Sequence, residues 1–224
     1  MDEVVVVFTR SPELGATKTR LAEALGDVRT QRIARAMLWD TLELATRTAA
    51  DVICSFDGDE APMSEYSAFA RVRFHRRDRR RRVGDGIAEA VAHAFRRGYS
   101  RVLLIPSDAP TLARQDLKRA IDAVEGAEHA ALIPSLDGGI VGLALGSELP
   151  RAFAELRNST PTYCREAAVL LIRDGRTVRL LEPRRDIDSI ADARTAMRRL
   201  APASRTRREV AGSAALPAPA PHTP

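Results

Sequence analysis

Residues 4 to 21 read VVVVFTRSPELGATKTRL, and this stretch decides the fold. Its first part, Val4 to Phe8, is a β-branched run without polar alternation, which is typical of a strand buried on both faces of a parallel sheet. Pro12 and Gly15 then predict a turn, and a helix is expected after it. The order of strand, loop and helix indicates the first unit of an α/β fold.

The same alternation continues along the chain to about residue 200. From Thr30 to about Ala50, apolar residues recur at intervals of three and four, as on one face of an amphipathic helix. Short apolar runs predict further strands at 51–56, 72–74, 101–106, 129–134, 139–146 and 177–182, with helices at about 87–98, 116–124, 161–174 and 189–200. This pattern predicts an α/β sandwich with a mainly parallel sheet.

The composition changes after Leu200 to Ala, Pro, Ser and Arg, and the sequence ends in APAPHTP. Such a segment buries too little apolar surface to order itself. We therefore expect one domain over residues 1–200 and a disordered tail over 201–224.

The composition also limits the function classes. No apolar run is long enough to cross a bilayer, and the first eight residues carry acids where a signal peptide needs bases, so no membrane partner is expected. Cys54 and Cys164 lie too far apart in the sequence to suggest a metal or redox pair. They are expected to be structural thiols of a cytoplasmic protein.

The net charge is +5 and the isoelectric point is about 9.8. Much of the excess lies in residues 71–83 and 205–208, but aromatic residues for base stacking make up only 4% of the chain. These segments are therefore expected to be solvated basic surface rather than a nucleic-acid site. A basic surface also attracts a polyanionic small molecule.

Ligands of open α/β sheets bind at the carboxyl ends of the strands, so the loops that follow strands are the candidate site. In the opening loop, Gly15 allows backbone amides to approach a ligand. Lys18 and Arg20 then lie near a helix start, where phosphate is favoured. An ordinary surface turn with solvated cations explains this loop alone equally well.

Two further loops carry carboxylates. Asp108 follows the predicted strand 101–106, where a carboxylate suits Mg²⁺. After the last predicted strand, Asp186 and Asp188 point the same way along an extended segment, so one of them is a candidate second ligand. Helix capping and surface solvation are the alternatives for these residues.

Two glycine-containing motifs complete the candidate site. Asp137 to Gly139 form an Asp-Gly-Gly sequence that also fits a plain turn. Asp85 lies between two glycines at the start of a predicted helix, where it could be a simple cap.

Together these loops resemble the small bacterial GT-A-like proteins of the DUF2064 type, also called glycosyltransferase A or MobA-like proteins. The opening pattern of that family, F-x-K-x-P-x-x-G-x-x-K-T-R-L, is matched by Phe8, Pro12, Gly15, Lys18, Thr19, Arg20 and Leu21. Its later patterns G-x-D-x-P-x-L, D-G-G-Y and D-x-D-x-x-x-D resemble residues 107–112, residues 137–139, and Asp186 with Asp188 and Asp192. The resemblance covers roughly Val4 to Leu200.

Four positions depart from the family pattern. Arg10 replaces a lysine and Pro106 replaces a glycine, while Ile140 stands for a tyrosine and Asn158 for a tryptophan. The last two fall near the expected acceptor side and leave the identity of the acceptor open.

The resemblance implies a GT-A-like, Rossmann-like three-layer sandwich with a mainly parallel central sheet, a nucleoside-phosphate donor, and Mg²⁺ or Mn²⁺. The single aspartate of Ser107 to Pro110, and the similarity of KTRL to the K-S-R-L of phospholactate and phosphoenolpyruvate guanylyltransferases, favour nucleotidyl transfer. In that reaction a nucleoside triphosphate is joined to a phosphorylated small molecule and pyrophosphate is released. Two alternatives stay open: a GT-A glycosyltransferase with an NDP-sugar donor, and a non-catalytic nucleotide-binding protein that contacts a partner through Arg76 to Arg82.

The resemblance also suggests residue roles. Asp108 and Asp188 are expected to hold the metal, and Asp108 is grouped with Lys18 and Arg20 as catalytic. The nucleotide side comprises Arg10, Gly15, Lys18, Thr19, Arg20 and Asp85, and the acceptor side comprises Asp137, Gly138 and Gly139. The expected partners are the nucleotide and a small-molecule acceptor, and a homodimer stays open.

Overall fold

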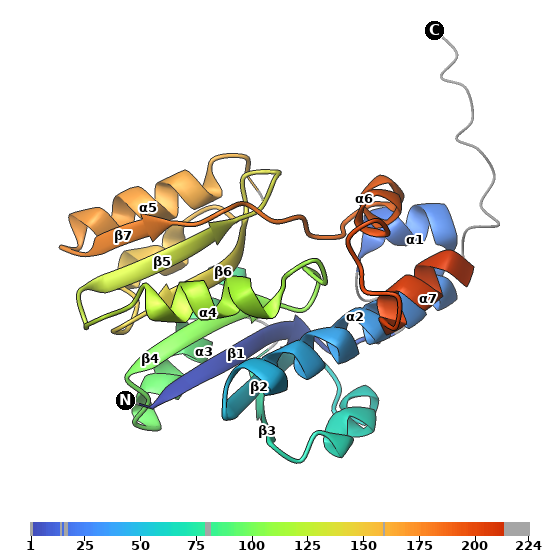
Figure 1. The fold of residues 1–224 in the computed structure, drawn as a ribbon, viewed down its shortest axis with the longest axis horizontal. Coiled ribbons are helices and arrows are strands. Elements are labelled where there is room, and N and C mark those ends of the chain that lie inside the picture. Colours follow the sequence, from blue (N-terminus) through green and yellow to red (C-terminus); the bar gives the residue numbers. More distant parts are fainter. Residues whose placement is uncertain (1, 14, 16–17, 79–81, 159, 213–224) are drawn as a thin grey trace, which may run out of the picture.

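The computed structural model describes residues 2–13, 15, 18–78, 82–158 and 160–212 (Figure 1). Over these residues seven strands form one sheet in the order β3-β2-β1-β4-β6-β5-β7. The strands are β1 (Glu3–Arg10), β2 (Asp51–Asp57), β3 (Val72–Arg76), β4 (Arg101–Pro106), β5 (His129–Pro134), β6 (Ile140–Leu145) and β7 (Thr177–Leu180). Only β6 runs antiparallel to its neighbours β4 and β5, which confirms the mainly parallel sheet.

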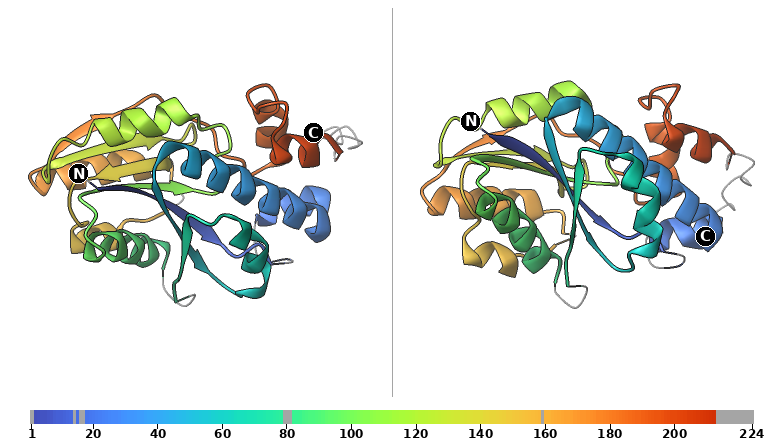
Figure 2. Two further views of the ribbon diagram at one scale, coloured as in Figure 1. Left: turned by 60° about the horizontal axis from the view of Figure 1, so that its bottom comes forward. Right: turned by 90° about the horizontal axis from the view of Figure 1, so that it is seen from below.

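Helices cover both faces of the sheet (Figure 2). The helices of the described residues are α1 (Thr19–Leu25), α2 (Asp27–Thr48), α3 (Val83–Arg96), α4 (Arg114–Asp122), α5 (Tyr163–Arg173), α6 (Ile190–Ala196) and α7 (Arg205–Gly212), with 3-10 helices η1 (Ala61–Ala68) and η2 (Arg151–Glu155). One face packs against α2, α4 and η1, and the other against α3, α5 and η2. The predicted three-layer sandwich is therefore confirmed.

The first strand lies at the centre of both apolar cores. All four residues from Val4 to Val7 have no solvent exposure. Val5 and Val7 belong to the core under α2 and α4, whereas Val4 and Val6 belong to the core under α3 and α5. This burial on both faces is the reason the run has no polar alternation.

A third apolar core, called here the end core, lies beyond the carboxyl edge of the sheet. It joins α1, the first half of α2, α6 and α7 through Leu21, Ile33, Met37, Ile187, Ala193, Ala196, Leu200 and Val210. Figure 1 shows these helices grouped at one end of the molecule. The end core is where segments from both ends of the described chain meet.

The prediction of disorder from residue 201 is wrong for residues 205–212, which form α7. The carboxylate of Asp40 on α2 accepts hydrogen bonds from the backbone N–H groups of Arg205 (3.0 Å) and Thr206 (2.8 Å). Asp40 thereby satisfies the exposed donors at the start of α7. Val210 is buried in the end core. Residues 213–224 lie outside the described part of the chain.

The basic segment 71–83 is only partly surface. Arg77 is 5% exposed; its guanidinium lies 3.8 Å from the Phe8 ring centroid and donates to the carbonyl oxygen of Thr9 at 2.7 Å. The expectation of a wholly solvated segment is therefore wrong at Arg77, which follows β3 and whose side chain reaches across β2 to contact β1. Residues 79–81 lie outside the described part.

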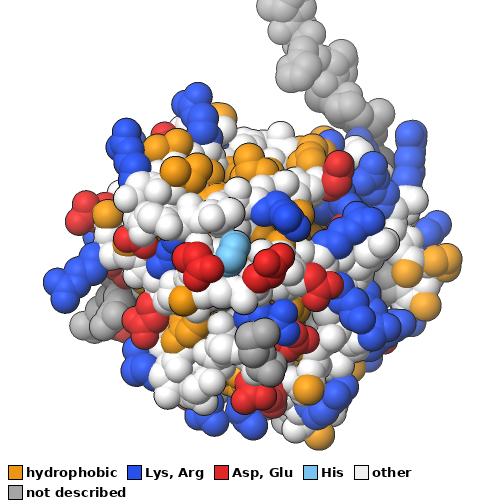
Figure 3. Space-filling model, turned by 60° about the vertical axis from the view of Figure 1, so that its left-hand side comes forward, with side chains coloured by type: hydrophobic (Ala, Val, Ile, Leu, Met, Phe, Trp, Pro, Cys, Tyr) orange, Lys and Arg blue, Asp and Glu red, His pale blue; other side chains and the backbone are white. Residues whose placement is uncertain are grey.

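The cysteines, the helices and one side of the surface give three further observations. Cys54 and Cys164 are buried free thiols, which agrees with the structural role expected for them. Within the described residues, the helices are too short or too polar to traverse a bilayer. On the side of the molecule that carries the amino ends of the strands, acidic and basic side chains are interspersed (Figure 3).

Candidate metal and nucleotide site

The carboxyl ends of β4 and β5 are joined by the segment that follows β7. In this segment, the backbone N–H of Arg184 donates to the carbonyl oxygen of Pro134 at 2.9 Å, and that of Ile187 donates to the carbonyl oxygen of Asp108 at 2.8 Å. The segment therefore crosses from the end of β5 to the end of β4 and carries Asp186 and Asp188 to that edge of the sheet.

Arg184 and its neighbour fix this crossing segment. The Arg184 guanidinium donates two hydrogen bonds, of 2.9 and 2.5 Å, to the carboxylate of Asp116 on α4. The hydroxyl of Thr111 donates to the carbonyl oxygen of Arg185 at 2.6 Å. Sequence reasoning missed these supports because nothing in the local sequence links α4 to a segment about 70 residues later.

Lys18 lies between the two aspartates that the sequence assigned to the metal. Its Nζ donates to Asp108 Oδ2 at 2.6 Å and also to Asp188 Oδ1. The Lys18 side chain is only 14% exposed. Burial by itself lowers the pKa of this amine, but the charges of Asp108 and Asp188 outweigh burial and raise the pKa above its usual value. The amine is therefore a firmly held cation.

Three carboxylates gather beside this ion pair. Asp137, Asp186 and Asp188 each offer an oxygen, and these oxygens all lie within 4.8 Å of one another. Asp186 accepts a hydrogen bond from the hydroxyl of Ser135 at 2.9 Å. Burial raises the pKa of Asp186 to about 6, the hydrogen bond from Ser135 opposes this rise, and the charge of Asp137 adds to it.

This donor set fits a hard divalent cation. Its ligand atoms are carboxylate oxygens, which Mg²⁺ and Mn²⁺ prefer. Among the described residues, the Lys18 ammonium group pairs with Asp108 and Asp188, and Asp137 and Asp186 gather beside Asp188, so carboxylates outnumber the ammonium group. The structure thus brings together both residues predicted to bind metal and adds Asp137, which the sequence had placed on the acceptor side.

The other residues predicted to bind phosphate lie at the end of β1, in the loop after it and in the first turn of α1. Thr19 and Arg20 are exposed on the first turn of α1. Arg10, at the end of β1, has a side chain that is 61% exposed and lies 3.8 Å from Asp57. Gly15 has a φ of +71°, a backbone conformation that favours glycine, which agrees with the predicted turn.

Asp85 is engaged locally. It lies in the first turn of α3, and its carboxylate is 3.2 Å from the Arg82 guanidinium. The two flanking glycines are explained by packing, because a Cβ on Gly84 would lie 2.6 Å from the carbonyl oxygen of Ala154 and one on Gly86 would lie 2.5 Å from Arg77. Among the described residues, the ion pair of Asp85 is therefore with Arg82, on its own helix start.

The Asp-Gly-Gly turn packs tightly against Pro161, just before α5. Gly138 has a φ of +93°, and a Cβ there would lie 2.0 Å from the carbonyl oxygen of Pro161. Asp137 accepts a hydrogen bond from the backbone N–H of Gly139 at 3.0 Å. The turn thus requires glycine for its fold and presents Asp137 to the acidic group.

The family model described as "Uncharacterized protein conserved in bacteria (DUF2064)" matches residues 41–160. The chain belongs to this family. The resemblance found in the sequence motifs is therefore confirmed for the DUF2064 protein. None of the curated proteins is similar enough in sequence to count as a relative.

Solved structures agree with the fold of this DUF2064 protein. A candidate nucleotide-diphospho-sugar transferase from Desulfovibrio desulfuricans G20 is 25% identical, covers 96% of each chain and has a TM-score of 0.84. Rv0371c from Mycobacterium tuberculosis H37Rv, solved with manganese, is 18% identical over 87% of this chain and 97% of its own, with a TM-score of 0.55.

A third structure is a CMP:2-keto-3-deoxy-manno-octonic acid synthetase in complex with CTP. It is 12% identical over 88% of this chain and 97% of its own, with a TM-score of 0.57. At such identities the last two structures share the fold alone. The fold of this DUF2064 protein is therefore one that nucleotide-dependent transferases use.

Proposed function

We propose that this DUF2064 protein is a metal-dependent nucleotidyltransferase that joins a nucleoside triphosphate to a phosphorylated small molecule and releases pyrophosphate. The observation that carries the proposal is the gathering of carboxylates around Lys18 at the carboxyl edge of the sheet. Ligands of open α/β sheets bind at this edge. The fold shared with a CTP-bound synthetase supports the same class of substrate.

Asp188 belongs both to the pair of carboxylates that holds Lys18 and to the group of Asp137, Asp186 and Asp188. It is therefore the central metal ligand of the proposal. Asp108 is its proposed partner, with Asp186 and Asp137 close by. A divalent cation held by these carboxylates would neutralise the negative charge that develops on the donor phosphates during transfer. The manganese complex of the structural neighbour Rv0371c is consistent with such a site.

The cationic side chains have a separate role. Lys18, Arg20 and Arg10 follow β1, and we assign them to the phosphates of the donor, where positive charge stabilises the departing pyrophosphate. The attacking group is a phosphate that is already an anion, so no side chain has to remove its proton. The work of the protein is then to position two anions against each other despite their mutual repulsion.

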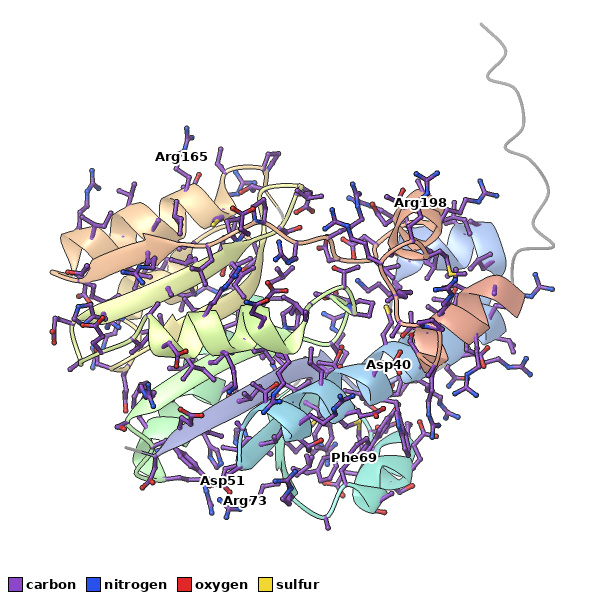
Figure 4. All side chains as sticks on the ribbon, in the orientation of Figure 1. Asp40, Asp51, Phe69, Arg73, Arg165 and Arg198 are labelled. Atoms are coloured by element: carbon purple, nitrogen blue, oxygen red, sulfur yellow. The ribbon has the colours of Figure 1, made fainter. Side chains whose placement is uncertain are left out.

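The direct test is to incubate the protein with Mg²⁺ or Mn²⁺, each nucleoside triphosphate and a panel of phosphorylated acids and sugars, and to measure pyrophosphate. Asp188→Asn should remove several kcal/mol of charge stabilisation in the transition state. Turnover should therefore fall roughly a thousandfold or more. The matched control is Asp51→Asn. Asp51 pairs with Arg73 at 3.6 Å and lies at the start of β2, on the opposite edge of the sheet (Figure 4).

Glycosyl transfer is the second candidate, because the D. desulfuricans structure is described as a candidate nucleotide-diphospho-sugar transferase. Consumption of an NDP-sugar, with no pyrophosphate from any nucleoside triphosphate, would support it over nucleotidyl transfer. Unchanged turnover in Asp188→Asn would contradict the site in both cases.

A further inference from the structure

Lys18 makes ion pairs with the carboxylates proposed to bind the metal. Its Nζ lies within hydrogen-bonding distance of Asp108 Oδ2 and of Asp188 Oδ1. A single nitrogen that contacts both carboxylates lies in the space between them, where a bridging cation would also bind. An amine and a metal ion cannot share the same acceptor oxygens at full strength, so the two compete.

The backbone at Lys18 supports the view that the ion pairs hold the side chain in place. Among the described residues, Lys18 is the only residue other than glycine with a positive φ, at 55° with a ψ of 54°. This left-handed conformation is unfavourable for a residue with a Cβ and persists where the surroundings enforce it. Loss of the ion pairs would remove that enforcement and allow the residue to leave the conformation.

We propose, building on the function proposed above, that the Lys18 amine occupies the cation position between Asp108 and Asp188 and that the divalent metal displaces it. The displaced ammonium then needs a new anionic partner in a site where only 14% of its side chain is exposed. The phosphates of the nucleotide are the partner of matching charge. Metal and nucleotide therefore bind cooperatively. The metal frees the Lys18 amine to bind phosphate, and phosphate draws the amine away from the carboxylates that bind the metal.

This coupling is reciprocal. If phosphate binding withdraws Lys18 from the carboxylates, metal affinity rises, and metal binding must raise phosphate affinity by the same factor. Before the nucleotide arrives, Lys18 offsets part of the negative charge of Asp108 and Asp188 and keeps the metal weakly bound. A metal held only by Asp137, Asp186 and Asp188 would leave Lys18 with Asp108, and this is the competing arrangement that the test must exclude.

The composition provides an internal reference for the test. The chain contains two lysines, Lys18 and Lys118. Lys118 lies on α4 and is exposed. After limited acylation of amines, mass spectrometry of the peptides gives the labelling rate of each lysine in the same sample. Without metal, Lys18 should be labelled far more slowly than Lys118.

Mn²⁺ alone is then added to the wild-type protein. Displacement predicts that labelling of Lys18 rises toward that of Lys118, whose own rate stays constant. Tripolyphosphate added together with Mn²⁺ should protect Lys18 again. If Mn²⁺ binds, as measured by calorimetry, and Lys18 stays protected, the displacement is wrong while the metal site of the proposed function survives.

Variants provide the second readout, which is Mn²⁺ affinity without nucleotide. Lys18→Met should bind Mn²⁺ about tenfold more tightly than the wild type, within the usual range of coupling between two sites. Lys18→Arg keeps the competing charge and should show no such gain, and the control Lys118→Met should match the wild type. Mn²⁺ binding to Lys18→Met but not to the wild type would support displacement in its strongest form.

Two further outcomes separate the failures. If neither the wild type nor Lys18→Met binds Mn²⁺, both the displacement and the metal-dependent function are wrong. If Lys18→Met binds more tightly but Asp108→Asn binds as well as the wild type, the metal does not use Asp108, and the displacement is overturned while metal binding remains.

Discussion

Ile187 is hydrogen bonded through its backbone N–H to the carbonyl oxygen of Asp108, at 2.8 Å. This bond ties the segment after β7 to the loop after β4. The Ile187 side chain is fully buried in the end core together with Leu21 and Val210. The positions of Asp186 and Asp188, on either side of Ile187, therefore depend on how that core packs.

Shortening Ile187 should disturb both stability and the site. Ile187→Ala is expected to lower the free energy of unfolding by about 2–5 kcal/mol, and Ile187→Val by about 0.5–1.5 kcal/mol. Under conditions where Ile187→Ala is folded, its affinity for Mn²⁺ should be lower than that of the wild type. Leu171→Ala, in the core under α5, is the matched control: it should be destabilised to a similar degree yet retain the affinity. Equal loss of affinity in both variants would contradict a specific link between the end core and the metal site.

Asp40 should anchor α7. Asp40→Ala removes the acceptor for Arg205 and Thr206 N–H groups and is expected to destabilise the protein by about 0.5–2 kcal/mol, as for other capping residues. The fluorescence of Trp39, the single tryptophan of the chain, should change as well, because the Arg205 guanidinium lies 3.5 Å above its ring. Figure 4 shows Asp40 on α2 beside α7.

The control for Asp40 is Glu43→Ala, an exposed acid on the same helix. It should change neither the stability nor the emission of Trp39 appreciably. An unchanged spectrum in Asp40→Ala would mean that α7 does not need this anchor.

Without metal, Asp186 should make stability depend on pH. Its pKa in the folded protein is about 6, above the ordinary value of 3.8. The folded state therefore binds a proton more tightly than the unfolded state does, so this group favours folding at low pH, and its contribution is lost as pH rises from about 4 through about 6. Asp186→Asn removes the effect. Denaturant unfolding of both proteins should show the variant gaining stability relative to the wild type over this interval, and parallel pH profiles would refute the assignment.

Gly138 should tolerate no side chain. Its φ is +93°, and a Cβ added there would lie 2.0 Å from the carbonyl oxygen of Pro161. Gly138→Ala should therefore destabilise the protein by well over about 2 kcal/mol, because rigid backbone must move. Gly26 has a φ of +77°, but a Cβ there would meet nothing within 4 Å. With a ψ of 160°, Gly26 lies in a region that glycine alone favours, so Gly26→Ala should show only the conformational cost of about 1–3 kcal/mol. Similar losses in thermal unfolding of the two variants would contradict the packing argument.

Much of the fold could be predicted because it follows from local patterns. The uninterrupted run Val4 to Val7 indicates a strand with two buried faces, and a strand of that kind requires a layered α/β fold. The candidate carboxylates Asp108 and Asp188 follow from the same logic, since the ends of parallel strands meet at one edge. The family match over residues 41–160 then confirmed the family to which the motifs pointed.

The remaining features depend on contacts between distant segments. Helix α7 has few apolar residues, and its first N–H groups are satisfied by Asp40, which is 165 positions away from Arg205. The pairing of Lys18 with Asp108 and Asp188 likewise joins residues 90 and 170 positions apart. Composition and periodicity describe a segment by itself, so they could not show either contact.

The end core also has a practical consequence for preparing this protein. Strand β1 begins at Glu3 on the edge of the sheet opposite the carboxylates, whereas α7 packs in the same core as Ile187 (Figure 1). A surface tether or fusion partner attached before β1 would leave the site facing the solution. One attached after α7 would be joined to the helix that supports the site, so the amino-terminal side is the better place of attachment for immobilised protein.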